Sequence, residues 1–187
     1  MLAPREREIR CARAGNAVIV SGDLGSHGIA ILSVREGLGF EGAVASDTAS
    51  LWPAVESLLD AGVEVHCLRD LTRGGLASAL NEIATAARLA ITIDEAAIPI
   101  APVVRGACEL LGLDPLYVAN EGRFVAFVAA PDAERAVDVL RRHHVSRDAV
   151  LAGHVSDDDP GRVILCSHIG GTRVLDMISG EQLPRIC

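Results

Sequence analysis

The sequence predicts one layered domain of the mixed α/β or α+β class. Its 187 residues are 50% hydrophobic, which is enough apolar material for one sizeable core. Short β-branched runs alternate along the chain with segments whose apolar residues recur every three or four positions. No internal repeat and no low-complexity linker separates these segments. Alternating strands and helices are typical of a sheet covered by helices.

The individual elements follow from these two periodicities. Strands are predicted in the β-branched runs, most of them bounded by Gly, Asp or Pro, at Ala17–Val20, Val63–Leu68, Ile91–Ile93, Phe124–Val128, Val150–Val155 and Val163–Cys166. Helices are predicted at Ile29–Gly37, Leu51–Ala61, Leu76–Ala87, Val103–Leu111 and Asp132–His144. The acidic run at 157–161 predicts a solvated turn between two strands, because its three neighbouring carboxylates repel one another and nothing nearby completes a metal site.

Composition excludes two classes of partner. The net charge is −8 and only 3% of residues are aromatic, so the chain has neither the basic surface nor the stacking platform of a nucleic-acid binder. No apolar stretch approaches the roughly 20 residues that span a bilayer. Arginine and glutamate residues occupy the start of the chain, where a signal peptide would be apolar. We therefore expect a cytoplasmic protein.

The cysteines predict one reactive thiol. Five cysteines without a CxxC spacing favour neither a disulfide framework nor a structural zinc site. Cys67, Cys108 and Cys166 lie in apolar runs and are expected to be inert core residues. Cys187 is the last residue and follows Pro184, so we expect an extended, mobile tail that carries an accessible thiol. The alternative is a chance cysteine at a frayed end. Prenylation does not explain Cys187, because a prenylated cysteine stands four residues from the end.

The first of three glycine-containing loops is Ser21–Gly28, between a predicted strand and a predicted helix. Its glycines permit close backbone approach, and a helix N-terminus offers N–H groups to an anion. The spacing matches neither a Rossmann fingerprint nor a P-loop. His27 is a candidate acid/base or phosphate donor, or else a residue at the start of the helix that is bonded to the backbone.

The second loop, Asp70–Leu76, also joins a strand to a helix. Thr72 is a candidate helix cap there, and Arg73 is a cation beside Gly74 and Gly75. Together with Asp70, these residues suit an anionic oxygen. A capping turn with a surface arginine explains the same pattern equally well.

The third loop, Ala119–Gly122, comes just before an apolar strand. Glu121 could act there as a general base if it is partly buried. A solvated loop glutamate is the other interpretation.

Several segments taken together resemble the HypE family of hydrogenase maturation factors, within the wider superfamily of aminoimidazole ribonucleotide synthetase and selenophosphate synthetase. The resemblance covers nearly all residues from about 14 to 187, and its most specific part is the terminal Pro-Arg-Ile-Cys. The matching segments are Val18–Gly22, Gly25–Gly28, Leu68–Leu76, Leu116–Gly122, Ile169–Arg173 and Pro184–Cys187.

The resemblance implies a layered α/β/α arrangement of the α+β class and an ATP-dependent carbamoyl dehydratase. It implies that the carbamoyltransferase HypF loads a carbamoyl group on Cys187, and that dehydration gives a thiocyanate for the HypC–HypD complex, as the source of cyanide in nickel–iron hydrogenases. Glu121 matches the family's base. The residues expected near the nucleotide phosphates are Asp70, Thr72, Arg73, Gly74, Gly75 and His27, and the resemblance assigns no metal ligand in this chain.

Members of this family carry a further domain of comparable size ahead of the matching region. That domain supplies most of the ATP and magnesium site and the principal surface of a homodimer. The resemblance therefore implies that this chain is the C-terminal portion, with a linker remnant at 1–16, the synthetase-like domain at 17–178 and the tail at 179–187, and that alone it is a poor dehydratase. Two other readings stay open: another ATP-using enzyme of the superfamily, and a non-enzymatic module that presents a thiol to partners.

Overall fold

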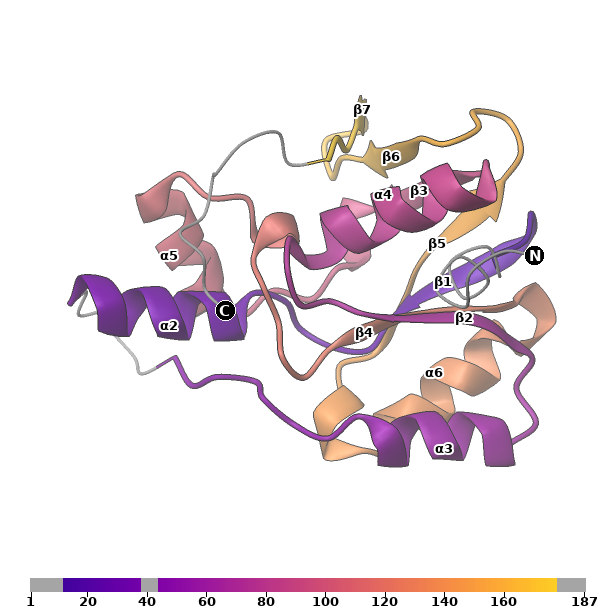
Figure 1. Cartoon of the computed structure of the whole chain (residues 1–187), viewed down its shortest axis with the longest axis horizontal. Coiled ribbons are helices and arrows are strands. Elements are labelled where there is room, and N and C mark those ends of the chain that lie inside the picture. The colour runs from indigo at the N-terminus through magenta and orange to yellow at the C-terminus, as the bar shows by residue number, and fades with distance from the viewer. Residues whose placement is uncertain (1–11, 38–43, 178–187) are drawn as a thin grey trace, which may run out of the picture.

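A single mixed sheet organises the residues that the computed structural model describes, which are 12–37 and 44–177 (Figure 1). Its seven strands lie in the order β2-β4-β1-β5-β3-β6-β7, and only β3 and β6 run parallel among the paired neighbours of this sheet. The strands are β1 (Asn16–Val20), β2 (Val65–Asp70), β3 (Ala90–Asp94), β4 (Phe124–Ala129), β5 (Val150–Ser156), β6 (Val163–Cys166) and β7 (Thr172–Val174).

Helices cover both faces of the sheet. The helix α4 packs on one face, α3 and α6 pack on the other, and α2 and α5 lie together beyond one end of the strands (Figure 1). The helices are α2 (Ser26–Glu36), α3 (Trp52–Asp60), α4 (Gly75–Ala87), α5 (Pro102–Leu111) and α6 (Ala133–Arg141). This three-layer arrangement confirms the α+β, layered α/β/α fold class expected from the sequence.

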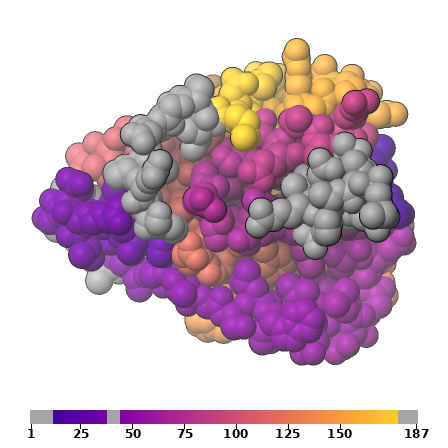
Figure 2. All heavy atoms as spheres, viewed as in Figure 1, coloured from indigo at the N-terminus to yellow at the C-terminus, as the bar shows by residue number. Residues whose placement is uncertain are grey.

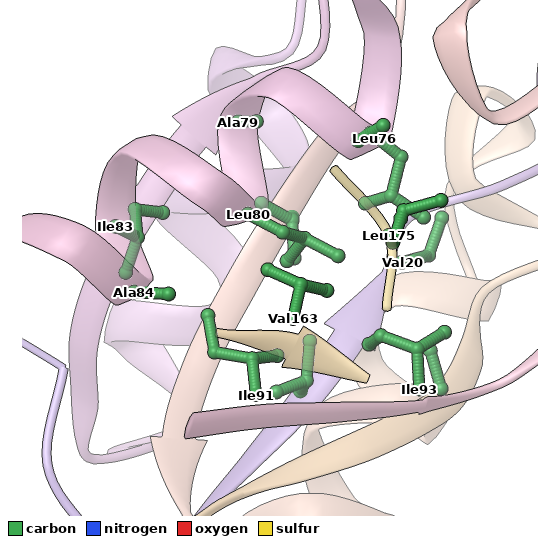
Figure 3. Packing of buried hydrophobic residues seen from close by; sticks show 14 of the residues in the cluster. Val20, Leu76, Ala79, Leu80, Ile83, Ala84, Ile91, Ile93, Val163 and Leu175 are labelled. Carbon is green, nitrogen blue, oxygen red and sulfur yellow. The ribbon is translucent and has the colours of Figure 1, made fainter. Parts of the chain in front are cut away.

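The central strands are buried on both sides, because each presents side chains alternately to two cores. In β1, Val18 and Val20 join the core under α4, whereas Ala17 and Ile19 join the core under α3 and α6. Figure 3 shows the first of these cores, with the apolar side chains of α4 facing those of the strands below it. This two-sided burial explains why the strands read as nearly continuous apolar runs.

The expected elements all occur, with shifted ends. The strand β2 lies two residues later than expected, and α2 begins at Ser26 instead of Ile29, which puts His27 in its first turn. The strand β7 was not predicted, because its three residues are exposed and carry no apolar alternation. It forms by pairing with β6, which is a tertiary contact and leaves no local signal.

Three loops meet at one end of neighbouring strands because of the directions in which these strands run. Both β1 and β2 pair antiparallel with β4, which lies between them. The loops that leave β1 and β2 therefore meet the loop that enters β4, at the edge nearest α2 and α5 (Figure 1). These are the three loops that the sequence analysis singled out.

Figure 2 shows the face of the molecule on which α4 lies. In the space-filling view, the magenta surface of α4 lies between the yellow segment around β7 above it and the purple surface of α3 below it (Figure 2). Within 12–37 and 44–177, no helix is both long and apolar enough to cross a lipid bilayer.

The core under α4 makes a quantitative prediction. Leu80 is fully buried on α4, so Leu80→Ala should lower the free energy of unfolding by about 2–5 kcal/mol through lost burial and a residual cavity. The matched control is Leu110→Ala on α5, where the side chain is 73% exposed and the change should stay within about 0.5 kcal/mol. Urea unfolding measures both, and equal losses would contradict this assignment of the core.

Candidate functional site

Asn120 joins the three loops. It is fully buried, and its side-chain oxygen accepts a hydrogen bond from the amide of Gly25 at 2.8 Å. Its side-chain nitrogen donates to the carbonyl oxygens of Leu71 at 3.1 Å and Val118 at 3.0 Å. The first, second and third loops thus share one amide side chain. In the sequence, Asn120 is distinguished only by its place directly before Glu121.

The glycines of the first loop serve packing within the protein. Gly28 donates its amide to the carbonyl of Ala119 at 3.0 Å, and a side chain on Gly28 would overlap Val118. Gly25, at φ 87°, is the residue before α2 and donates to Asn120. The close approach that these glycines permit is therefore made by the third loop, against which α2 packs, and not by an anion.

His27 lies half-buried in the first turn of α2. One ring nitrogen, Nδ1, is hydrogen-bonded to Ser46 Oγ at 2.9 Å. Its position at the start of the helix agrees with one of the two interpretations of the sequence, although the bonded partner is a side chain and not the backbone. Ser46 precedes α3 and was not singled out from the sequence.

The second loop leaves the N-terminus of α4 without a side-chain cap. The residue before the helix is Gly74, at φ 72°, so the expectation that Thr72 caps it was wrong. The Thr72 hydroxyl instead donates to Asp70 Oδ2 at 3.3 Å, because two turn residues separate it from the first helical amides. A side chain on Gly75 would come within 2.6 Å of two carbonyl oxygens of the 116–118 segment.

The polar groups of this second loop reach solvent. Asp70 and Arg73 are exposed, and Asp70 is ion-paired with Arg69 at 3.3 Å. An uncapped helix N-terminus beside an exposed arginine suits an anion such as a phosphate group. The residues present thus fit a phosphate. For a metal the fit fails, since no group of three or more His, Cys, Asp or Glu is gathered within the described parts of the chain.

Glu121 is half-buried in the third loop. Its amide donates to Asp47 Oδ1 at 3.0 Å, and the next residue, Gly122, lies so close to the carbonyl of Asp47 that any side chain would overlap it. The structure therefore places Glu121 beside the first and second loops through Asn120, and beside the segment that precedes α3 through Asp47. The Asp47 side chain is only 1% exposed.

Arg123 is a further residue that sequence reasoning missed. Its guanidinium forms an ion pair with the Asp23 carboxylate, and its Nε donates to the Asp23 carbonyl at 2.8 Å. Its Nη1 donates to the carbonyls of Gly122 at 2.8 Å and Val145 at 3.2 Å. A charged residue directly before a buried strand was the available signal, but its partner Asp23 is 100 residues away.

A hollow of about 250 Å³ opens beside this arginine. Its walls come from Asp23 in the first loop, from Arg123, from residues 46–49 before α3, and from residues 144, 145, 147 and 148 after α6. The segment before α3 thus lines this hollow, and it is joined to the candidate site by the hydrogen bonds of Ser46 with His27 and of Asp47 with the Glu121 amide.

The cysteines differ from one another in exposure. Cys67 and Cys108 are buried, as expected, and burial raises the pKa of the Cys108 thiol to about 11. The expectation that Cys166 is a core residue was wrong, because it is half-buried at the end of β6, where it pairs with Thr172 of the exposed strand β7. Cys187, the candidate reactive thiol, lies outside the described residues.

Removing the shared amide should loosen the loops. In Asn120→Ala the amide of Gly25 and the carbonyl of Leu71 lose a buried partner, so we expect a loss of about 3 kcal/mol in the free energy of unfolding. Hydrogen exchange at the Gly25 amide should accelerate. The control is Asn81→Ala, a buried asparagine on α4 that bonds the carbonyls of Ala77 and Leu175 and leaves the loops untouched. Unchanged exchange at Gly25 in Asn120→Ala would contradict the role given to this amide.

Thiol alkylation tests the assignment of the cysteines. At pH 8 the native protein should leave Cys108 unmodified, because the thiolate is the reactive form and a pKa of about 11 keeps it scarce. Raising the pH toward 11 or adding urea should restore reaction at this site. Peptide mapping after iodoacetamide treatment measures the extent of alkylation at Cys108. The half-buried Cys166 is the comparison. Fast modification of native Cys108 at pH 8 would count against its burial.

Comparison with solved structures supports this arrangement. A structure of the hydrogenase maturation protein HypE in complex with ATP superposes with a TM-score of 0.91 at 42% identity, over 100% of this chain and 57% of that one. The HypE of a HypE–HypF complex gives a TM-score of 0.86 at 37% identity, over 91% of this chain and 55% of that one.

Curated relatives lead to the same family. The carbamoyl dehydratase HypE of Cupriavidus necator is 51% identical over 176 residues, 94% of this chain and 50% of that protein, and the one of Escherichia coli is 45% identical over 93% of this chain and 51% of its own length. This chain spans about half the length of these relatives. The family model for AIR synthase related protein, C-terminal domain, matches residues 13–166. The chain therefore belongs to the AIR synthase related family as one of its C-terminal domains, and within it is similar to the C-terminal portion of the HypE hydrogenase maturation proteins.

Proposed function

We propose that this chain is the C-terminal part of an ATP-dependent carbamoyl dehydratase. Its substrate is a thiocarbamate on Cys187, and its product is a thiocyanate that donates cyanide during the maturation of nickel–iron hydrogenase. The observation that carries the proposal is the position of Glu121. This residue matches the family's base. It lies in the third loop, where Asn120 is hydrogen-bonded to the first and second loops and the Glu121 amide donates to Asp47.

The chemistry requires a leaving group and a base. The oxygen of the thiocarbamate leaves poorly as hydroxide, and ATP, when bound, supplies a phosphoryl group that converts this oxygen into phosphate. One N–H proton is lost when this oxygen is phosphorylated, and the second must go to a base as the C–O bond breaks and phosphate leaves, which gives S–C≡N on the cysteine. Glu121 is the carboxylate of the third loop that takes such a proton.

The second loop provides the anion-binding part of this scheme. The uncapped N-terminus of α4, the Thr72 hydroxyl and the exposed Arg73 would hold phosphate oxygens beside Gly74 and Gly75. Asp70 would orient Thr72, whose hydroxyl already donates to it. The described residues gather no set of ligands for magnesium.

His27 would donate to the same phosphate or transfer a proton. Its Nδ1 is engaged by Ser46, so Nε2 is the ring nitrogen left to face a ligand from the first turn of α2.

The proposed partners follow from the similarity to HypE. We propose a HypF-type carbamoyltransferase as the source of the carbamoyl group, since the solved HypE–HypF complex contains a relative 37% identical to this chain. We also propose a HypC–HypD-type complex as acceptor, a homodimer at the full length of the relatives, and a cytoplasmic location. Because the chain spans about half of its relatives, its own dehydratase activity should be weak until a domain corresponding to their other half is added.

Intact-protein mass spectrometry tests the proposal. The chain is incubated with a HypF-type enzyme, carbamoyl phosphate and ATP, with and without the other domain of a relative in trans, and Cys187 is mapped by peptide analysis. Wild-type protein should gain a carbamoyl group and then lose one water. Glu121→Gln should gain the group but lose water about 10²–10⁴-fold more slowly, because a neutral amide cannot take the proton.

The control is Cys187→Ala, which should gain nothing. Loss of water at the wild-type rate in Glu121→Gln would refute the assignment of the base. An unmodified Cys187 under all conditions would refute the dehydratase, and dehydration of a free small substrate by Cys187→Ala would favour another ATP-using enzyme of the superfamily.

A further inference from the structure

A buried carboxylate lies directly behind the loop of Glu121. Asp47 belongs to the segment between α2 and α3, 74 residues before Glu121 in the chain, and its side chain is 1% exposed. Although the residue lines the hollow, its carboxylate is not a candidate for contact with a ligand, because the Oδ2 oxygen is itself buried. Its contacts with the protein are therefore what can carry a function.

We propose that Asp47 is a positioning residue that fixes the main chain at Glu121 and so sets the direction of the Glu121 carboxylate. This inference rests on the proposed function, in which Glu121 is the base. It adds a residue that neither the glycine-containing loops nor the family resemblance singled out.

Asp47 contacts three consecutive residues, Glu121 and Gly122 of the third loop and Arg123 just after it. Its Oδ1 accepts the hydrogen bond from the Glu121 amide at 3.0 Å. Its carbonyl oxygen occupies the space where Gly122 would carry a side chain. Its Oδ2 lies 3.9 Å from Nη1 of Arg123. The main chain at Glu121 is thus fixed by the hydrogen bond of its own amide and by the contacts that the next two residues make with Asp47.

The charge of Asp47 has a directional effect. Oδ2 has no hydrogen-bond donor among the described residues, so its stabilising contact is the attraction to the Arg123 guanidinium. That guanidinium is itself fixed by the Asp23 carboxylate and by the carbonyl of Val145. In a poorly hydrated environment such an attraction is stronger than in water. It keeps Oδ2 toward Arg123 and Oδ1 toward the Glu121 amide.

Asp47 and its neighbour Ser46 connect the loops of the two candidate proton-transfer groups, His27 and Glu121. Ser46 Oγ bonds to His27 Nδ1 at 2.9 Å and to Thr48 Oγ1 at 2.7 Å. His27 and Glu121 are therefore attached to adjacent residues of one segment, although they come from different loops. A displacement of this segment would misalign both groups relative to a substrate.

The test compares Asp47→Ala with Asp47→Asn. The alanine variant removes the acceptor for the Glu121 amide, whereas asparagine retains an oxygen there and loses only the charge toward Arg123. Exchange of the Glu121 amide proton should accelerate in Asp47→Ala and stay slow in Asp47→Asn. This readout does not depend on the reaction. Asp60→Asn, an exposed acid at the end of α3, is the matched control and should change nothing.

The kinetic readout is single-turnover dehydration of carbamoylated Cys187 in the complemented protein. We expect Asp47→Ala to slow this step by about 100-fold, the effect of displacing a reacting group by about 1 Å, with the KM for ATP unchanged. Asp47→Asn should recover most of the rate. In a Glu121→Gln background Asp47→Ala should have no further effect, because the group that it positions is already lost.

Two results overturn the inference. One is unchanged exchange at the Glu121 amide in a folded Asp47→Ala variant. The other is an equal fall in rate in the wild-type and Glu121→Gln backgrounds, which would mean that Asp47 acts on overall stability. If Glu121→Gln itself dehydrates at the wild-type rate, the proposed base fails, and the positioning role fails with it. The rate of Glu121→Gln distinguishes the two failures. If only the positioning role of Asp47 fails, Glu121→Gln still dehydrates more slowly than the wild type.

Discussion

The hydrogen bonds of one buried amide hold the candidate site together. Asn120 has an acceptor and two donor positions on its side chain, and each is used by a different stretch of backbone. Leu24 and Leu71 also anchor the first and second loops in the core under α4, but apolar packing has no direction of its own. A fully satisfied buried amide fixes both distance and orientation, because an unpaired group there would be costly. The relative placement of His27, Arg73 and Glu121 depends on this constraint.

The missing side chains of glycine make these contacts possible. At Gly28, Gly75 and Gly122, a Cβ atom would collide with a neighbouring loop or with the carbonyl of Asp47. These collisions are with the protein itself. Glycines in a loop are often interpreted as space for a ligand, and here they serve as space for another segment of the same chain. The loops are therefore closely packed behind the surface that carries the polar groups.

The charged groups around the candidate site form a buried set and an exposed set. Arg123 donates to three carbonyls and pairs with the Asp23 carboxylate while it is mostly buried, and the buried Asp47 carboxylate lies 3.9 Å from it. Such an arrangement contributes little net stability relative to apolar packing, but breaking it would leave an uncompensated charge. Its effect is on geometry. The groups suited to bind phosphate, the N-terminus of α4 and Arg73, lie instead at the exposed side, where an anion can arrive.

The sequence alone determined the periodic elements, the layered class and the three loops, because apolar spacing and glycine punctuation are local properties of the chain. It also determined the family resemblance, and it pointed to Glu121 and His27 as candidates. The tertiary structure decided the rest. That Asn120 joins the loops, that Asp47 and Arg123 support Glu121, that Thr72 does not cap α4 and that β7 exists all depend on partners distant in the sequence or on the path of the backbone. No local pattern encodes which residue, 74 or 95 positions away, will meet a given amide, because that choice is made only when the sheet brings the ends of its strands to one edge.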